Sequence, residues 1–138
     1  AEFEAGLVDA GLKLVAREVG NFNFEQAKTA AREMFDRDDH PDAVFVSNDH
    51  MAFAVMDVLR FELGLSIPND VSVVGYDDVS LAAWPSYDLT TVRQPANRMV
   101  TETVDILMTR MDDTDALPRR VTIDGPLIIR GSARKPKG

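Results

Sequence analysis

Short runs of β-branched and apolar residues alternate along the chain with longer stretches in which apolar positions recur every three or four residues. The short runs are typical of buried strands, and the longer stretches are typical of helices that bury one face. The runs predict strands at residues 14–19, 43–46, 71–74, 90–93, 121–123 and 127–130. The helical spacing predicts helices at residues 3–11, 23–35, 48–63 and 95–111.

Several helix boundaries carry their own signals. Asn23 can cap the second helix, and Gln26 three residues later completes a capping-box pattern. Asn48 or Asp49 can cap the third helix, and Gly64 can end it. Because strands alternate with helices, the predicted fold class is α/β, with a parallel sheet flanked by helices.

The composition narrows the class of protein. A chain of 138 residues can form one compact domain, or one lobe and part of another. Hydrophobic residues make up 45% and charged residues 28%, which is typical of a globular domain. The net charge of −8 disfavours direct binding of nucleic acid, because phosphate contacts need a basic surface. The sequence contains no cysteine, which excludes disulfides and thiolate chemistry.

Other kinds of site find little support in the sequence. No apolar run reaches membrane-spanning length and no signal peptide opens the chain, so a cytoplasmic location without membrane contact is expected. His40 and His50 lie near acidic residues, but their spacing matches no metal motif, and no metal site is expected. No cofactor and no catalytic residue is expected either, since glycine-rich phosphate loops and a nucleophile elbow are missing. The basic tail, with Arg130, Arg134, Lys135 and Lys137, is most simply a frayed terminus.

Polar and aromatic side chains follow three of the predicted strands. Phe22 comes after the first, Asn48 and Asp49 after the second, and Asp77 and Asp78 after the third. The carboxyl ends of parallel strands meet at one edge of a sheet, where ligands bind. A carboxylate accepts hydrogen bonds from hydroxyls, an amide donates and accepts, and an aromatic ring covers the C–H face of a sugar. This set predicts a site for a sugar or another polyol.

Each of these residues also has a simpler interpretation, which the sequence leaves open. Asn48 and Asp49 can serve only as helix caps. The pair Asp77 and Asp78 can form a solvated turn. Phe22 can pack as a hydrophobic staple on the helix that follows it.

Three segments read VSNDHMA at residues 46–52, IPNDVSVVGYDD at residues 67–78 and LTTVRQP at residues 89–95. In their order and spacing they resemble the lactose-repressor (LacI/GalR) family of transcription regulators. The resemblance covers essentially the whole chain and corresponds to the C-terminal part of such a regulator. It implies a type I periplasmic-binding-protein-like fold, in which this chain supplies the C-terminal lobe and a segment of the other lobe.

The resemblance also implies roles for particular residues, carried over position by position. Asp77 would hold hydroxyl groups of a small-molecule effector, Asn48 would hydrogen-bond the same ligand, and Phe22 would stack on it. Gln94, at the crossover to the other lobe, would contact the ligand or lock the hinge. Trp84 would wall the pocket or pack within the lobe.

By the same resemblance, residues 1–94 form the effector-binding lobe, residues 95–126 belong to the other lobe, and residues 127–138 return to the first lobe and form the tail. The helix at 96–111 is rich in methionine and has more apolar positions than one narrow stripe, which suits a buried core helix or a helix with a partner face. We expect self-association through this helix, as a dimer or a larger assembly. Asp49 and Asp78 are expected to hold backbone groups and helix ends.

Three functions follow from these expectations. The favoured one is a non-enzymatic effector-sensing core of a transcription regulator, with a carbohydrate as effector and with DNA bound only through a helix-turn-helix head outside this chain. The alternative is a lobe of a transport-type periplasmic sugar-binding protein, which has the same architecture without a role on DNA. A glycosidase that uses Asp77 and Asp49 as acid and base ranks last.

Overall fold

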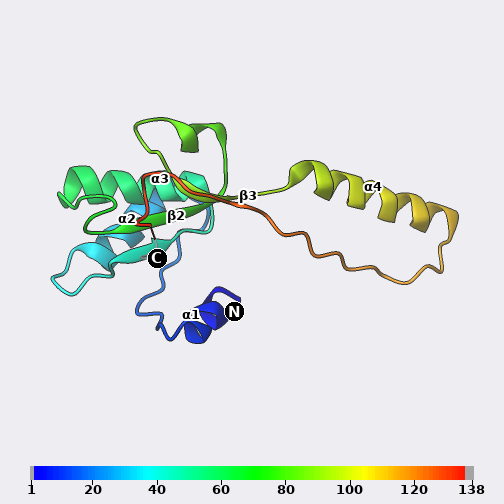
Figure 1. Cartoon of the computed structure of the whole chain (residues 1–138), viewed down its shortest axis with the longest axis horizontal. Coiled ribbons are helices and arrows are strands. Elements are labelled where there is room, and N and C mark those ends of the chain that lie inside the picture. Colours follow the sequence, from blue (N-terminus) through cyan, green and yellow to red (C-terminus); the bar gives the residue numbers. More distant parts are fainter. Residues whose placement is uncertain (1, 136–138) are drawn as a thin grey trace.

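The computed structural model describes residues 2–135, in which a four-stranded sheet forms the centre of the lobe (Figure 1). Its strands lie side by side in chain order, as β1 (Ala43–Phe45), β2 (Ser72–Asp77), β3 (Thr90–Arg93) and β4 (Leu127–Ile128). The first three strands are parallel, and β4 runs antiparallel to β3. The predicted α/β class with a mainly parallel sheet is therefore confirmed.

Two helices build the core together with the sheet. Helix α2 (Phe24–Phe35) begins at Asn23, whose Oδ1 accepts a 3.0 Å hydrogen bond from the backbone N–H of Gln26, as the capping pattern predicts. Helix α3 (Asp49–Asp57) packs against α2 and β2 and continues as a π-helical segment, η1 (Val58–Glu62). The largest fully buried apolar side chains are Met56, Leu59, Leu89, Val58, Val71 and Val73.

The predicted glycine end of the third helix is confirmed. Gly64 has a φ of +66°, a left-handed conformation that glycine adopts without a steric penalty. The backbone N–H of Leu65 donates a 2.7 Å hydrogen bond to the carbonyl of Leu59, across the end of η1. The chain therefore leaves the helix at Gly64 and turns toward β2.

Strand β2 extends further than the sequence pattern predicts. It continues through Gly75 and ends at Asp77, so the glycine does not end the strand. A Cβ atom on Gly75 would lie 2.3 Å from Oδ1 of Asp49, which means that the buried carboxylate occupies this space. The glycine is thus needed for a close approach, and the strand carries Asp77 to its own carboxyl end.

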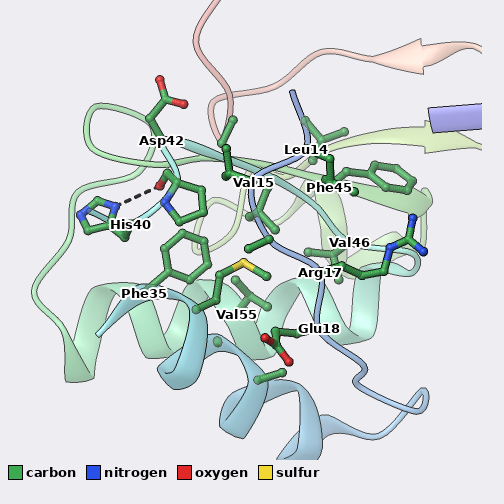
Figure 2. Close-up of a pocket in the computed structure, with 18 of the residues that line it drawn as sticks. Leu14, Val15, Arg17, Glu18, Phe35, His40, Asp42, Phe45, Val46 and Val55 are labelled. Atoms are coloured by element: carbon green, nitrogen blue, oxygen red, sulfur yellow. Dashed lines mark hydrogen bonds between the residues drawn. The ribbon is translucent and has the colours of Figure 1, made fainter. Parts of the chain in front are cut away.

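The strand predicted at residues 14–19 is wrong. This segment runs beside α2 and β1 and lines a cavity of about 1050 Å³ (Figure 2). Within the described residues, no backbone hydrogen bond joins residues 14–19 to β1. Leu14 and Val15 therefore line this cavity with Phe35 and Phe45, and the alternating pattern gives an extended segment that does not enter the sheet.

Helix α4 (Ala96–Asp112) and the chain that returns from it extend away from the sheet as an arm (Figure 1). The helix matches the prediction, and none of its residues is buried. Residues 121–123 lie in the returning part of this arm and form no strand, because no other strand runs beside them there. The division of the chain at residues 94 and 126 stays a prediction.

The N-terminal helix α1 (Glu2–Asp9) confirms the predicted helix at the start of the chain. It contacts the lobe through Phe3, whose ring stacks on the ring of Phe45 with 5.0 Å between the centroids. A short 3-10 helix, η2 (Ser80–Ala83), follows β2. Among residues 2–135, no helix has the length and apolar character that crossing a membrane requires.

Candidate functional site

Asp77 and Gln94 form the centre of the candidate site. Asp77 is the last residue of β2, and its partner across the parallel pair is Arg93, the last residue of β3, so Gln94 comes next to Asp77. The side-chain amide of Gln94 donates a hydrogen bond to Oδ1 of Asp77, and its backbone N–H lies 3.4 Å from the Asp77 carbonyl oxygen. Both residues are half-buried. The structure therefore brings together two of the predicted residues.

Asn48 follows β1, the neighbour of β2, and caps α3. Its Oδ1 accepts a 2.8 Å hydrogen bond from the backbone N–H of Met51, so the capping interpretation is confirmed. Within the described residues, its side-chain Nδ2 donates to no other group. Because β1, β2 and β3 are parallel, Asn48, Asp77 and Gln94 lie at or just after the carboxyl ends of three neighbouring strands.

Asp49, the next residue, is fully buried and belongs to the framework of the lobe. Its Oδ1 accepts a 2.6 Å hydrogen bond from the hydroxyl of Thr91, and its Oδ2 accepts a 2.9 Å hydrogen bond from the backbone N–H of Val79. It also lies in the first turn of α3, where the helix dipole favours a negative charge. Both carboxylate oxygens thus have donors from the protein, in agreement with its predicted role of holding backbone.

Asp78 holds the ends of three segments together. Its side chain is only 5% exposed, and it forms ion pairs with Arg93 and, at 2.6 Å, with Arg130. Burial acts to raise the pKa of the Asp78 carboxyl, but hydrogen bonds and charge from the two arginines outweigh it and leave that pKa below its usual value. A solvated turn at Asp77 and Asp78 is therefore wrong for Asp78.

Phe22 and Trp84 present exposed rings. Phe22 is 76% exposed, so it does not pack as a staple on α2. Its loop reaches the start of α3 through Gly20, where a Cβ atom would lie 2.6 Å from the sulfur of Met51. Trp84 is 57% exposed at the end of η2, so its ring is not part of the buried core.

The cavity of Figure 2 is separate from these residues. It is lined by residues 12–18, by α2 and by β1, with Arg17, Glu18 and His40 among its polar groups. Neither Asn48, Asp77 nor Gln94 lines it. The Nδ1 atom of His40 already has a hydrogen-bond partner there, because it lies 3.0 Å from the carbonyl oxygen of Pro41. In the part of the chain that the structure describes, no group of three or more metal-binding side chains is found.

Sequence reasoning missed the role of the C-terminal segment. Arg130 and Ser132 were expected in a frayed tail, but Ser132 is buried, and its hydroxyl donates a 2.6 Å hydrogen bond to the carbonyl of Val73. The hydroxyl also accepts a 2.8 Å hydrogen bond from the backbone N–H of Thr90. Arg130 lies 52 positions from Asp78, and no local pattern in the sequence predicts such a pair. Lys137, in the same tail, lies outside the described residues.

Comparison with known proteins gives a consistent family. A family model described as a periplasmic binding protein-like domain matches residues 1–133. The repressor PurR of Vibrio vulnificus is 39% identical over 116 residues, which are 84% of this chain and 34% of PurR. The ribose operon repressor of Escherichia coli K12 is 34% identical over 133 residues, which are 95% of this chain and 40% of that repressor. The chain thus spans between a third and two fifths of these relatives.

Solved structures agree with the sequence relatives. The transcriptional regulator CelR in complex with cellobiose has a TM-score of 0.85 and 33% identity, with 95% of this chain and 40% of CelR covered. The Lac repressor bound to ONPG has a TM-score of 0.84 and 25% identity, with 95% of this chain and 39% of the repressor covered. The chain belongs to the periplasmic binding protein-like family and carries part of an effector-binding domain of the LacI/GalR regulator type.

Proposed function

We propose that this chain forms part of the effector-sensing core of a transcription regulator, and that its effector is a carbohydrate. The carbohydrate would be held by Asn48, Asp77 and Gln94 at the edge of the sheet where β1, β2 and β3 end, which we call the rim. The observation that carries the proposal is the Asp77–Gln94 hydrogen bond at the end of two parallel strands. The carboxylate has a second oxygen to accept from a hydroxyl, and the Gln94 amide has a second N–H and a carbonyl oxygen. Such a pair suits neighbouring hydroxyl groups, which both donate and accept.

In this proposal the remaining predicted residues add further contacts to the ligand. Asn48 uses its oxygen as a helix cap, which leaves its Nδ2 as a donor for a ligand oxygen. The exposed rings of Phe22 and Trp84 can cover the apolar C–H face of a sugar. Two relatives support a carbohydrate, since one solved structure is a complex of CelR with cellobiose and another is the Lac repressor bound to ONPG.

In this proposal the ligand acts by favouring one arrangement of two lobes over another. A ligand shifts such an equilibrium only as far as it binds one arrangement better. Residues 95–126 would belong to the second lobe, and the exposed arm is consistent with that division. DNA would be bound in the cytoplasm by a helix-turn-helix head outside this chain. The name of one relative, the HTH-type transcriptional repressor PurR, supports such a head.

The exposed arm also supports self-association. The apolar side chains of α4 that are exposed include Met99, Val100, Val104, Leu107, Met108 and Met111. Exposed apolar surface of this kind marks an interface in soluble proteins. We propose that α4 packs against a partner helix in a dimer or larger assembly.

The alternatives differ in what supports them. A transport-type sugar-binding protein remains a second candidate, because the matching family model describes a periplasmic binding protein-like domain. An export leader in the gene would favour it, and an upstream helix-turn-helix would contradict it. A glycosidase is disfavoured, since Asp49 is buried and both of its oxygens already accept hydrogen bonds. A non-enzymatic role is therefore part of the proposal.

The test uses the full-length protein that the gene encodes. Its binding to operator DNA is measured in the presence of each member of a panel of mono- and disaccharides that includes cellobiose. Asp77→Ala should abolish the response to the active sugar and leave DNA binding largely unchanged. Loss of a hydrogen bond to a charged group corresponds to roughly 10- to 100-fold weaker ligand binding. Asp38→Ala, at an exposed acidic residue in a loop before β1, is the control and should respond normally. An unchanged response of Asp77→Ala would contradict the proposal.

A further inference from the structure

Two consecutive residues at the rim have backbone angles that residues other than glycine rarely adopt. Asp77 has a φ of +125° and Asp78 a φ of +60°. A residue in such a conformation is strained, and it persists where the surrounding structure over-determines it. The turn after β2 therefore needs interactions that hold it in place.

The side chain of Asp78 supplies those interactions. Its carboxylate is 5% exposed and lies between two guanidinium groups from different parts of the chain. Arg93 ends β3, and Arg130 lies in the segment that returns after β4. Arg130 also donates a 2.7 Å hydrogen bond to the carbonyl of Leu89, just before β3. Through its one carboxylate, Asp78 thus connects the turn to Arg93 at the end of β3 and, by way of Arg130, to Leu89 just before β3.

The same turn sets the position of the residue proposed to bind the ligand. Asp77 shares a peptide bond with Asp78, and both its carbonyl and its carboxylate face Gln94. A rotation of that peptide would turn the Asp77 carbonyl oxygen away from the backbone N–H of Gln94 and so break one of the two hydrogen bonds that join these residues. Resting on the function proposed above, we infer that Asp78 is a positioning residue, whose pairing with Arg93 and Arg130 holds Asp77 and Gln94 as a preformed pair for the effector.

A general packing role for Asp78 makes a different prediction. An asparagine has the same shape as aspartate and also tolerates the left-handed conformation, so Asp78→Asn keeps the packing and the backbone preference. It removes the negative charge and one of the two oxygens that accept hydrogen bonds from Arg93 and Arg130. If Asp78 acts by packing alone, the Asp77–Gln94 pair should survive this substitution.

The test follows the side-chain amide of Gln94 by NMR in the full 138-residue chain, where no ligand is needed. Asp78→Asn should make exchange of the amide protons with water about five- to tenfold faster, which corresponds to the loss of roughly one hydrogen bond. Asp39→Asn is the matched control, because Asp39 pairs with Arg37 on the exposed surface and loses the same charge. Exchange in this control should equal that of the unchanged chain.

Each outcome decides the matter. Unchanged Gln94 exchange in a folded Asp78→Asn chain would overturn the inference, as would an equal increase in Asp39→Asn. If Asp78→Asn fails to fold, Arg93→Gln takes its place, since the Arg93 side chain is 54% exposed and its removal leaves the core intact. A smaller increase in exchange is then expected, and no increase would overturn the inference. Because the readout needs no ligand, its failure is distinct from failure of the sugar response of the whole protein.

Discussion

The hydroxyl of Thr91 donates a 2.6 Å hydrogen bond to Oδ1 of Asp49, a residue 42 positions earlier in the chain. Both residues are fully buried. The other oxygen of Asp49 accepts from the backbone N–H of Val79. One carboxylate therefore joins the start of α3 to the centre of β3 and to the loop that follows β2.

This arrangement predicts that Thr91→Val destabilises the lobe. Valine has the shape of threonine but no hydroxyl, so a buried carboxylate oxygen would lose its donor, at a cost of about 1–3 kcal/mol in the free energy of unfolding. Urea denaturation followed by circular dichroism measures the change. Thr91→Ser keeps the hydroxyl and should lose less. A Thr91→Val chain as stable as the unchanged one would show that water replaces the donor.

The close approach of Gly75 to Asp49 predicts a second effect. In Gly75→Ala, the new methyl group would lie 2.3 Å from Oδ1 of Asp49 and 2.9 Å from Cδ2 of Leu89, so buried groups must shift. Overpacking of this kind lowers stability by typically 1–3 kcal/mol.

Gly6→Ala provides the matched control for Gly75→Ala. Gly6 lies within α1, and no heavy atom stands within 4 Å of the position of its Cβ. Alanine there should raise helix stability by roughly 0.5–1 kcal/mol. If both alanines have the same effect on the urea midpoint, the close approach at Gly75 does not limit stability.

The sequence predicted the elements whose signals are local. Asn23 and Asn48 cap helices as expected, and Gly64 ends one, because each of these roles depends on only a few neighbouring residues. The strands at 14–19 and 121–123 were wrong for the opposite reason. An apolar alternation favours extended chain, but a strand also requires a partner, and neither segment has one in the sheet.

The candidate site shows the same division between local and distant information. Asp77 could be predicted, since it follows a buried run and the carboxyl ends of parallel strands collect ligands. The hydrogen bond between the Gln94 amide and Asp77 depends on the register of β2 against β3, and this register cannot be predicted from the sequence. The pairing of Asp78 with Arg130 depends on how the returning segment passes β3, so no spacing rule could reveal it.

Asn48 offers a way to separate capping from ligand binding. Asn48→Ala removes the hydrogen bond to the N–H of Met51 and should cost roughly 1 kcal/mol of stability. Asn48→Asp keeps an oxygen for the cap and places a negative charge at the helix N-terminus, so stability should be kept. It removes the amide donor, however, and should weaken binding of the active sugar.

Thermal unfolding and calorimetric titration of the two Asn48 variants give the measurements. Asn48→Asp should melt near the temperature of the unchanged chain while the whole protein binds sugar less tightly. If the Asn48→Asp protein and the unchanged protein bind the sugar with equal affinity, Asn48 serves only as a helix cap.

The pairing of Asp78 predicts a pH dependence of stability. The two arginines keep the pKa of Asp78 in the folded chain below the value of about 3.8 that an aspartate has when unfolded. The folded state therefore binds fewer protons, and this contribution to stability is full above the unfolded pKa and is lost as the pH falls through the folded pKa. Urea midpoints measured from pH 6 down to pH 2.5 should fall less steeply in Asp78→Asn. Parallel curves for the two chains would contradict the lowered pKa.

The exposed side of α4 predicts self-association. Val100, Val104, Leu107 and Met111 follow helical spacing, so they lie along one stripe of the helix, and Leu107 is 57% exposed. Sedimentation of the 138-residue chain should show a dimer or larger species at micromolar concentration. Leu107→Lys places a charge in this stripe and should shift the chain toward the monomer.

Thr109→Lys is the control for this stripe. It adds the same charge, also near the end of α4, but Thr109 lies nine positions after Val100 and thus half a turn away from the stripe. A lysine near the helix C-terminus is favourable in both variants, so a loss of helix is not the expected cause of dissociation. Equal sedimentation of the two variants, or a monomeric unchanged chain, would show that the apolar stripe of α4 is not the contact surface.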